Sequence, residues 1–391
     1  TFLQIVPLGD DWQAAIRDVR GVIADALANP ATQDEIDREA GEFAASLQVS
    51  VEQARTQSGG ELADTLAEAV NIRETVASPE VARDVFSNMK ERLTPANMLV
   101  ATRRMFGGTP LRAVLTLPKT EPNAEALLLA AIGRDVPPTA SKANAAVSFA
   151  RLPRLPGAAA TVVRASRIDG IGLDAVELSN GVKLQVFASN AEAGKVYVSV
   201  RFGRGLQALP TDRPSLAWTG AAALVASGIG DLGQNDLDRL TSGRRLNMAF
   251  GIAEDAFRLD AVTRAADLDD QLRLLVAKLA FPGWDPAPVL RVRAAMKTAH
   301  KIYGPKGVGA LYRRPFTMLT PLLHGGDPRW APPTLAEITA LTPAAFKTFW
   351  QPLLGSGPIE VSIFGDVEAA KAIDLDIARS RGEIAQALLD T

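Results

Sequence analysis

Residues 178–187 read LSNGVKLQVF, and this stretch sets the architecture of the second half of the chain. Its Asn180-Gly181 pair stands between two runs in which apolar and polar residues alternate. Asn and Gly adopt the positive φ angles of a tight hairpin turn most readily, so this pattern is the strongest short-range signal for a β-hairpin. Alternation returns at 195–202, and residues 214–226 are Ala-rich and helical in pattern until Gly228, which ends the helix. Strands followed by helices predict an α+β fold, with helices packed on one face of a mostly antiparallel sheet.

An internal repeat relates the two halves of the chain. The stretch Leu93-Thr94-Pro95-Ala96 recurs as Leu341-Thr342-Pro343-Ala344. In both copies a helical stretch, a Gly-rich turn and a proline follow, and the spacing from threonine to proline is the same. This match of order, prolines and spacing indicates that a module was duplicated, with an offset of about 250 residues, the size of one compact domain.

The segments around this motif correspond as well. We predict that each copy contains a strand, a helix that ends before a proline, and a closing strand after the Thr-Pro helix. A capping box at Thr32 and Glu35 opens a further helix in the first copy. Residues 178–255 have no counterpart in the first copy, so we expect Thr1 to begin partway through a module of a longer protein. The predicted segments are Thr1–Val6, Asp11–Ala28 and Arg112–Leu117 in the first copy, and Ala256–Val262, Asp267–Ala280 and Glu360–Phe364 in the second.

The stretch between the two copies has the composition of a connection. It contains one predicted helix, Ala124–Ile132, and then several prolines among small residues, which favour an extended and semi-rigid chain. We therefore predict three regions: the later part of an incomplete first module at 1–132, a linker at 133–165, and a second module at 166–391.

Composition excludes several classes of protein. The 391 residues include no Cys, so disulfides, thiolate nucleophiles and Cys-ligated metal sites are absent from the sequence. A net charge of −2 disfavours nucleic-acid binding, which usually needs a basic surplus. No apolar run reaches the roughly 18 residues that span a bilayer. One basic stretch is read as a solvated helix face with its loop, and it comprises Arg291, Arg293, Lys297, Lys301, Lys306, Arg313 and Arg314.

The hairpin at 178–187, the strand that ends in Phe202-Gly203-Arg204-Gly205 and the helix after it resemble the start of a pitrilysin/insulinase-type module. This family of zinc metallopeptidases includes the mitochondrial processing peptidases and the core proteins of the cytochrome bc1 complex. The resemblance covers nearly the whole chain and is strongest to the non-catalytic portion of large bacterial members with four modules. It implies two α/β sandwich modules of the metallohydrolase-like type, the first of them incomplete.

Active members of the family carry His-x-x-Glu-His on the helix after the second strand. The two His bind zinc and the Glu acts as general base. By this resemblance Trp218, Ala221 and Ala222 occupy those three positions, and the downstream carboxylate ligand falls near the basic segment Arg293–Lys297. None of the three side chains can bind a metal or transfer a proton, so the motif is fully degenerate.

The resemblance implies the non-catalytic part of a zinc endopeptidase, forming the closing half of a peptide-binding chamber and inactive alone. Zinc would sit in an upstream module of the parent protein. The partners would be that catalytic module and an unstructured peptide. The protein would be located in the periplasm or cell envelope. A non-proteolytic scaffold, similar to the bc1 core proteins, is the alternative. An enzyme of unrelated chemistry is a third possibility.

The remaining candidate residues have ordinary structural explanations. His300 and His324 are not spaced as a ligand pair, and no Gly-x-Ser-x-Gly motif is present. The Gly228–Gly233 stretch matches a dinucleotide fingerprint but follows a helix, whereas that motif requires a preceding strand. We assign no catalytic, cofactor-binding or metal-binding residue within the chain. Acid pairs at Asp10-Asp11 and Asp269-Asp270 are read as helix starts, and Trp12, Trp218, Trp284, Trp330 and Trp350 as packing residues.

Overall fold

The chain forms two compact units in a computed structural model, and each is described by itself. Unit 1 comprises residues 1–54 and 58–146, and unit 2 comprises 55–57 and 147–391. The structure describes all residues except 1, 6, 8–10, 55–56, 108–111, 118–119, 139–146, 154–159, 213, 305–306, 308, 310–318, 355 and 380–391.

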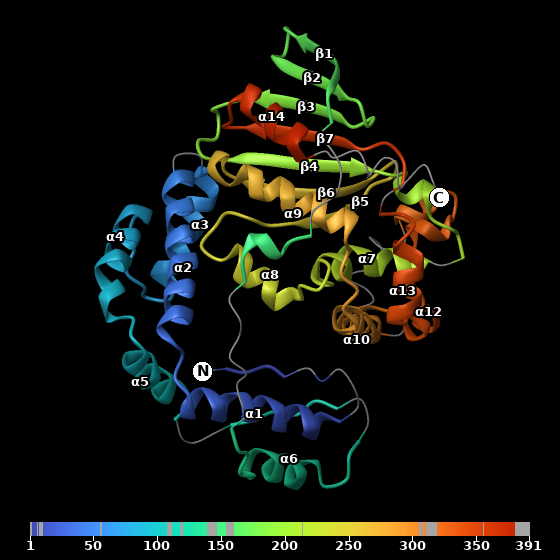
Figure 1. The fold of residues 1–391 in the computed structure, drawn as a ribbon. Coiled ribbons are helices and arrows are strands. Elements are labelled where there is room, and N and C mark those ends of the chain that lie inside the picture. Colours follow the sequence, from blue (N-terminus) through green and yellow to red (C-terminus); the bar gives the residue numbers. More distant parts are fainter. Residues whose placement is uncertain are drawn as a thin grey trace. The chain divides into compact units, whose positions relative to one another are not determined.

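Unit 2 is built on a mixed sheet with the strand order β1-β2-β3-β7-β4-β6-β5 (Figure 1). Only the β3–β7 pair is parallel, and all other neighbours in the sheet are antiparallel. The C-terminal strand β7 therefore lies between two strands from the start of the unit. The strands are β1 (Val162–Ile168), β2 (Leu173–Leu178), β3 (Lys183–Ala188), β4 (Val196–Phe202), β5 (Ala249–Ile252), β6 (Phe257–Thr263) and β7 (Glu360–Gly365).

The predicted hairpin is confirmed. Strands β2 and β3 pair in antiparallel register, and Gly181 has a φ of +79° in the turn between them. The Leu178 amide donates to the carbonyl of Val182, and the Asn180 side chain accepts from the Val182 amide at 3.2 Å. Because the loop needs a residue at positive φ, Gly at this position carries no conformational penalty.

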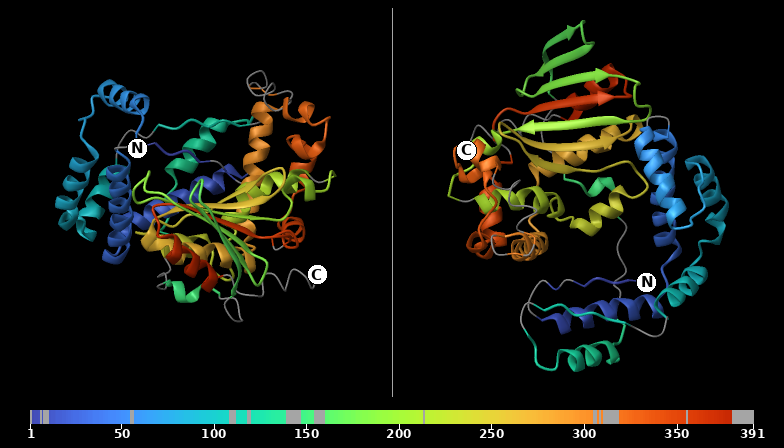
Figure 2. Two further views of the ribbon diagram at one scale, coloured as in Figure 1. Left: turned by 90° about the horizontal axis from the view of Figure 1, so that it is seen from above. Right: turned by 180° about the vertical axis from the view of Figure 1, so that it is seen from behind.

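Helices cover one face of this sheet. Helices α9 and α14 pack on each other, and they contact β6 and the β2–β3 pair respectively. Figure 2 (right) shows the opposite face, and none of the described helices of unit 2 lies over it. The predicted α+β arrangement is confirmed. The unit 2 helices are α7 (Pro214–Ala226), α8 (Gln234–Thr241), α9 (Leu268–Ala280), α10 (Pro286–Tyr303), α12 (Leu335–Ala340), α13 (Pro343–Trp350) and α14 (Ala369–Arg379).

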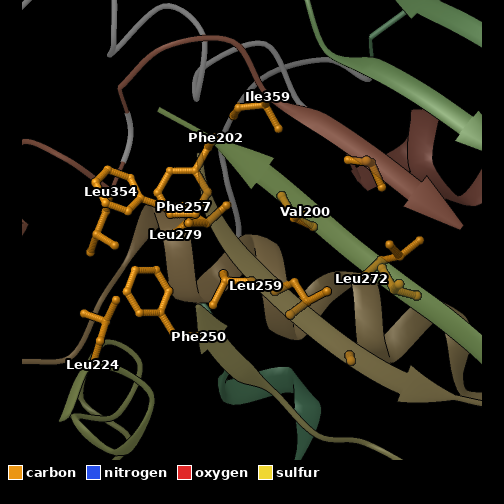
Figure 3. Close-up of a cluster of buried hydrophobic side chains, with 14 of the residues drawn as sticks. Val200, Phe202, Leu224, Phe250, Phe257, Leu259, Leu272, Leu279, Leu354 and Ile359 are labelled. Carbon is orange, nitrogen blue, oxygen red and sulfur yellow. The ribbon is translucent and has the colours of Figure 1, made fainter. Parts of the chain in front are cut away.

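A continuous hydrophobic core fills the space between sheet and helices. Alternate residues of the strands point into it, among them Val200, Phe202 and Leu259, and α9 contributes Leu272 and Leu279 (Figure 3). Burial of each such side chain contributes about 1.5–3 kcal/mol of free energy. The period-two pattern that predicted the strands is thus the pattern of core contacts.

Unit 1 consists of helices, and its described residues contain no strand. Helices α1 and α2 begin where predicted: Asp11 caps α1, and Thr32 and Glu35 form the capping box of α2. Asp10, the other member of that acid pair, lies outside the described residues. The helices are α1 (Trp12–Ala28), α2 (Gln33–Gln53), α3 (Gly59–Asn71), α4 (Pro79–Met89), α5 (Pro95–Phe106) and α6 (Ala124–Gly133).

Two strand predictions in unit 1 are wrong. Residues 2–5 and 112–117 have no assigned secondary structure, although Thr1–Val6 and Arg112–Leu117 have the alternation of strands. Thr1 and Val6 themselves lie outside the described residues. A strand forms only when a neighbouring strand takes up its backbone hydrogen bonds, and the described part of unit 1 offers no such neighbour.

The internal repeat is visible in matching helix caps. Thr94 starts α5 with φ −119° and ψ 155°, and its side chain accepts from the Asn97 amide. Thr342 starts α13 with φ −124° and ψ 154°, and its side chain accepts from the Ala345 amide. In both helices Pro stands at the first turn, where no backbone donor is needed.

The later part of the predicted linker, 133–165, includes residues that pack with unit 2. Leu152 is buried there beside Phe149, and β1 starts at Val162. Residues from Val147 onward therefore belong to the second compact unit.

Candidate functional site

Helix α7 carries the three positions that the sequence aligned with the metal motif. It packs against α10, the helix on which the downstream carboxylate position was expected. The buried Thr219 hydroxyl lies 3.9 Å from the sulfur of Met296 at this contact. The structure thus brings together the two segments, 218–222 and 293–297, that would form a zinc site.

The three motif positions share one exposed face of α7. Trp218, Ala221 and Ala222 are all exposed, whereas Thr219 and Gly220 between them are buried. Positions i, i+3 and i+4 of a helix lie on one side, so the spacing required by a His-x-x-Glu-His site is preserved here. The Trp218 indole N–H donates to the carbonyl of Ala331 at 3.0 Å.

These side chains do not fit a zinc ion. Zinc takes imidazole, thiolate or carboxylate ligands, and an indole and two methyl groups supply none of them. Arg293 of α10, in the segment where the downstream carboxylate was expected, donates to the carbonyl of Leu341 at 3.0 Å. Among the described residues no group of three or more His, Cys, Asp and Glu is placed to hold a metal.

The two histidines lie in different settings. His300 is in the last turn of α10, and His324 lies in the turn with Gly325. The imidazole of His324 stacks on the indole of Trp330, with ring centroids 3.6 Å apart. In the basic stretch, Arg291, Arg293, Lys297 and Lys301 lie on α10. Lys306, Arg313 and Arg314 lie outside the described residues.

The glycine-rich stretch after α7 is a turn. Gly228 has a φ of +85° and ends α7, and Gly233 precedes α8 as its N-cap. No strand leads into this turn, so the geometry of a dinucleotide site is missing, as the sequence context indicated.

A buried lysine caps this turn, and no sequence signal pointed to it. Lys278 of α9 is only 1% exposed. Its ammonium donates to the carbonyl of Gly228 at 2.7 Å and to the hydroxyl of Ser227 at 3.2 Å. Burial lowers the pKa of Lys278 to about 7. These hydrogen bonds join α9 to the end of α7, so we assign this residue a structural role.

The open face of the sheet carries a shallow hollow of about 410 Å³ over β4, β6 and β7. Tyr197, Ser199, Asp260 and Phe364 are among its lining residues. The Ser199 hydroxyl donates to the Asp260 carboxylate at 2.6 Å.

Cross-strand pairs order this face into rows. The rings of Phe187 and Phe364 stack with centroids 5.3 Å apart, and Tyr197 continues that row. The Tyr197 hydroxyl donates to Glu192, which also pairs with Lys195 at 2.6 Å. These hydrogen bonds from Lys195 and Tyr197 lower the pKa of Glu192. The result is a surface on which an apolar row lies beside a polar one.

Solved structures share the fold of this chain. The ferredoxin protease FusC, solved in complex with Arabidopsis ferredoxin, matches 97% of the chain with a TM-score of 0.55 and 16% identity. The periplasmic protease PqqL of Escherichia coli matches 95% of the chain with a TM-score of 0.52 and 16% identity. The chain has the fold of the pitrilysin-like M16 peptidases. It spans only 42% and 41% of the lengths of those two structures.

Other comparisons add little to the M16 fold. An inactive peptidase M16 domain from Pseudomonas fluorescens matches 55% of the chain and half of its own length at a TM-score of 0.41, which is too low to support an argument. No family model matches the chain. Two curated proteins share short local matches that cover less than a tenth of either chain. They are cysteine desulfurase IscS of Dictyoglomus turgidum (69% identity over 30 residues, 8% of each chain) and the mitochondrial cysteine desulfurase of Arabidopsis thaliana (71% over 31 residues, 7% of each).

Proposed function

We propose that the chain is the non-catalytic part of a zinc-dependent endopeptidase and forms the closing half of its peptide-binding chamber. The parent protein would carry the zinc ion in another module and act on unstructured peptides. A periplasmic or cell-envelope location is part of this proposal, supported by the fold shared with PqqL, a periplasmic protease. No described helix has the length and apolar composition that crossing a bilayer requires.

One observation supports the proposal: α7, whose residues the family resemblance aligns with the metal motif, packs against α10 and carries no metal ligand at those positions. Trp218, Ala221 and Ala222 share one exposed face of α7. The resemblance aligns them with the two ligands and the base of active members. A module that retains the fold but not the ligands can contribute surface to a peptidase, but it cannot contribute the zinc-bound water.

The open sheet face is the surface that we assign to the chamber wall. Its hollow combines the aromatic side chains of Tyr197 and Phe364 with the polar groups of Ser199 and Asp260. Such a mixed lining accepts many side chains without selecting one, which suits a peptidase of unstructured peptides. Closure over a bound peptide would exclude water and hold the scissile bond at the metal.

The test compares the parent protein with a variant that lacks residues 147–391. Zinc content and the cleavage rate of an unstructured fluorogenic peptide are measured for both. We expect both to retain the same zinc stoichiometry, while kcat/KM falls about 100-fold or more because substrate positioning is lost. Far-UV circular dichroism of the remaining protein provides the folding control.

Other outcomes distinguish the alternatives. Loss of zinc from the shortened variant would place the metal site in unit 2 and overturn the proposal. An unchanged cleavage rate would remove the chamber role. A parent without zinc and without cleavage would support the non-proteolytic scaffold instead.

A further inference from the structure

Helix α10 lies in a part of the sequence that has no acidic residue. No Asp or Glu occurs from Pro286 to Gly326. Arg293, Lys297 and Lys301 stand at every fourth position, so they share one face of the helix. The helix therefore carries a stripe of positive charge with no acidic residue of its own to balance it. The cations of α10 are Arg291, Arg293, Lys297 and Lys301.

The helices packed against α10 leave this charge unbalanced. They are α7, α12 and α13. Helix α7 has no charged residue, and the charged residue of α13 is Lys347. Helix α12 has one carboxylate, Glu337, which accepts from the Thr334 amide at 2.6 Å in a capping box. Asp285 precedes α10 and accepts from the Ala287 amide at 2.9 Å. Both carboxylates therefore serve as helix caps.

The cations of α10 also lack ion pairs. Arg291 and Lys301 are exposed and Lys297 is half-buried, and none of the three pairs with a carboxylate of the described residues. Arg293 donates to a neutral group, the carbonyl of Leu341. The charge of α10 is therefore available to an anionic ligand. Cations elsewhere in unit 2 commonly have a carboxylate partner, as do Arg167, Arg201, Arg239, Arg244, Arg264, Arg273 and Arg329.

The helix dipole accounts for only part of this pattern. Cations in the last turn of a helix interact favourably with its negative end, which explains His300 and Lys301. Arg291 and Arg293 lie in the first half of α10, where the dipole gives them no such support. Like charges four residues apart also destabilise a helix. The stripe therefore does not stabilise α10 by itself.

We propose that this stripe binds the acidic side chains of an extended peptide. Lys297 and Lys301 are about 6 Å apart along the helix axis, because a helix rises about 1.5 Å per residue. Alternate residues of an extended chain point to one side and are about 6.6–6.8 Å apart. Asp or Glu at alternate positions of the peptide therefore meets successive cations. The inference rests on the proposed function in taking this chain to be the substrate, and it narrows that substrate to acidic unstructured peptides.

Two other anionic partners fit this helix less well. A helix that lies on a membrane surface needs a free apolar face. On α10, however, Val289 is buried, Val292 packs on the core and Met296 contacts Thr219 of α7. Nucleic-acid binding usually needs a basic surplus, whereas the chain has a net charge of −2. An acidic polypeptide segment requires only the local stripe.

Peptide binding to this chain tests the inference without a cleavage step, so its outcome is separate from the deletion that tests the proposed function. The probe is a fluorescein-labelled peptide of alternating Glu and Ser, and the control peptide has Gln in place of Glu. Fluorescence anisotropy gives Kd for both. We expect the Glu peptide to bind at least about 10-fold more tightly. Its affinity should fall about 10-fold between about 50 mM and about 500 mM NaCl, because salt screens exposed charges. Equal binding of the two peptides would make α10 a solvated face and overturn the inference.

A matched pair of double charge reversals locates the binding site. Lys297→Glu with Lys301→Glu should raise the Kd of the Glu peptide about 10-fold or more. Lys90→Glu with Arg92→Glu, in the short helix η1 (Lys90–Arg92) of unit 1, changes the net charge equally and should leave Kd within about 2-fold. If circular dichroism shows that the reversal on α10 prevents folding, Lys297→Gln with Lys301→Gln replaces it, with an expected rise of about 5-fold. Equal effects of the two reversals, or binding of phosphatidylglycerol vesicles in place of the peptide, would overturn the inference.

Discussion

Replacement of Trp350 by alanine lowers the free energy of unfolding of unit 2 by about 3–5 kcal/mol. Trp350 is fully buried at the end of α13. Its ring meets those of Phe250 and Phe257 edge-on, with centroids 5.3 and 5.4 Å away. Its indole N–H donates to the carbonyl of Leu216 in α7 at 3.1 Å. The truncation leaves a cavity at the junction of α13, α7 and the sheet, and the surrounding rings cannot collapse into it without losing their own contacts.

Gly220 explains why the ring fits so closely. A Cβ at this position would lie 2.1 Å from Cζ2 of Trp350, so only glycine lets α7 approach the indole. Urea denaturation followed by circular dichroism measures the loss, because fluorescence itself changes when a Trp is removed. Trp218→Ala is the matched control: its side chain is 45% exposed, and we expect a loss of about 1 kcal/mol or less. A similar loss for the two variants would contradict the packing described for Trp350.

The second large effect is a dependence of stability on pH that Lys278 causes. Its pKa is about 7 in the folded protein because burial disfavours the ammonium, against about 10.4 in an unfolded chain. Between these values the unfolded state binds the proton and the folded state does not. The free energy of unfolding therefore rises with pH across this window, by about 2 kcal/mol between pH 7 and pH 9. This contribution is complete above about pH 10 and is lost as the pH falls through 7.

A Lys278→Met variant isolates this contribution. Denaturation at pH 7 and pH 9 gives, for each protein, the change in the free energy of unfolding over this interval. Subtracting the change in the variant from that in the wild type cancels the contributions of the other titrating groups. We expect the wild type to gain about 2 kcal/mol more than the variant over this interval. The Met variant also leaves the carbonyl of Gly228 without its lysine donor, which lowers stability at both pH values alike. Equal gains in the two proteins would show that Lys278 keeps its proton throughout.

Local signals predicted the hairpin and the helix starts well. The Asn180-Gly181 pair marked the hairpin, because its requirement for positive φ is local to two residues. The Thr-Pro motif marked the starts of α5 and α13 at Thr94 and Thr342, because a side-chain cap and a missing N–H act within one turn. The same signals did not predict the exposure of Trp218, which was interpreted as a packing residue and is 45% exposed.

Long-range features were not predictable from the same signals. Residues 2–5 and 112–117 have strand-like alternation but lack a pairing partner, and pairing is decided by distant chain. The parallel insertion of β7 beside β3 joins segments that are far apart in the sequence, with Lys183 opposite Glu360. Strand β1 lies in a stretch whose prolines and alanines are typical of a connection.

Lys278 illustrates the same limit for a single residue. In the sequence, Lys278 looks like any lysine of an amphipathic helix, and such lysines are usually exposed. Its burial depends on the packing of α9 against the end of α7, 50 residues away, where Gly228 offers a carbonyl. The stack of His324 on Trp330 was missed for a similar reason, because neither residue type signals its partner.

The central claim is that this chain has no zinc site and is inactive alone. Two measurements on the purified chain test it most directly: its zinc content, and its cleavage of an unstructured fluorogenic peptide with and without chelator. We expect no stoichiometric zinc and no cleavage by this chain alone. Stoichiometric zinc with chelator-sensitive cleavage would contradict that claim. Such a result would mean that Trp218, Ala221 and Ala222 do not mark the metal position and that a site including His300 or His324 does.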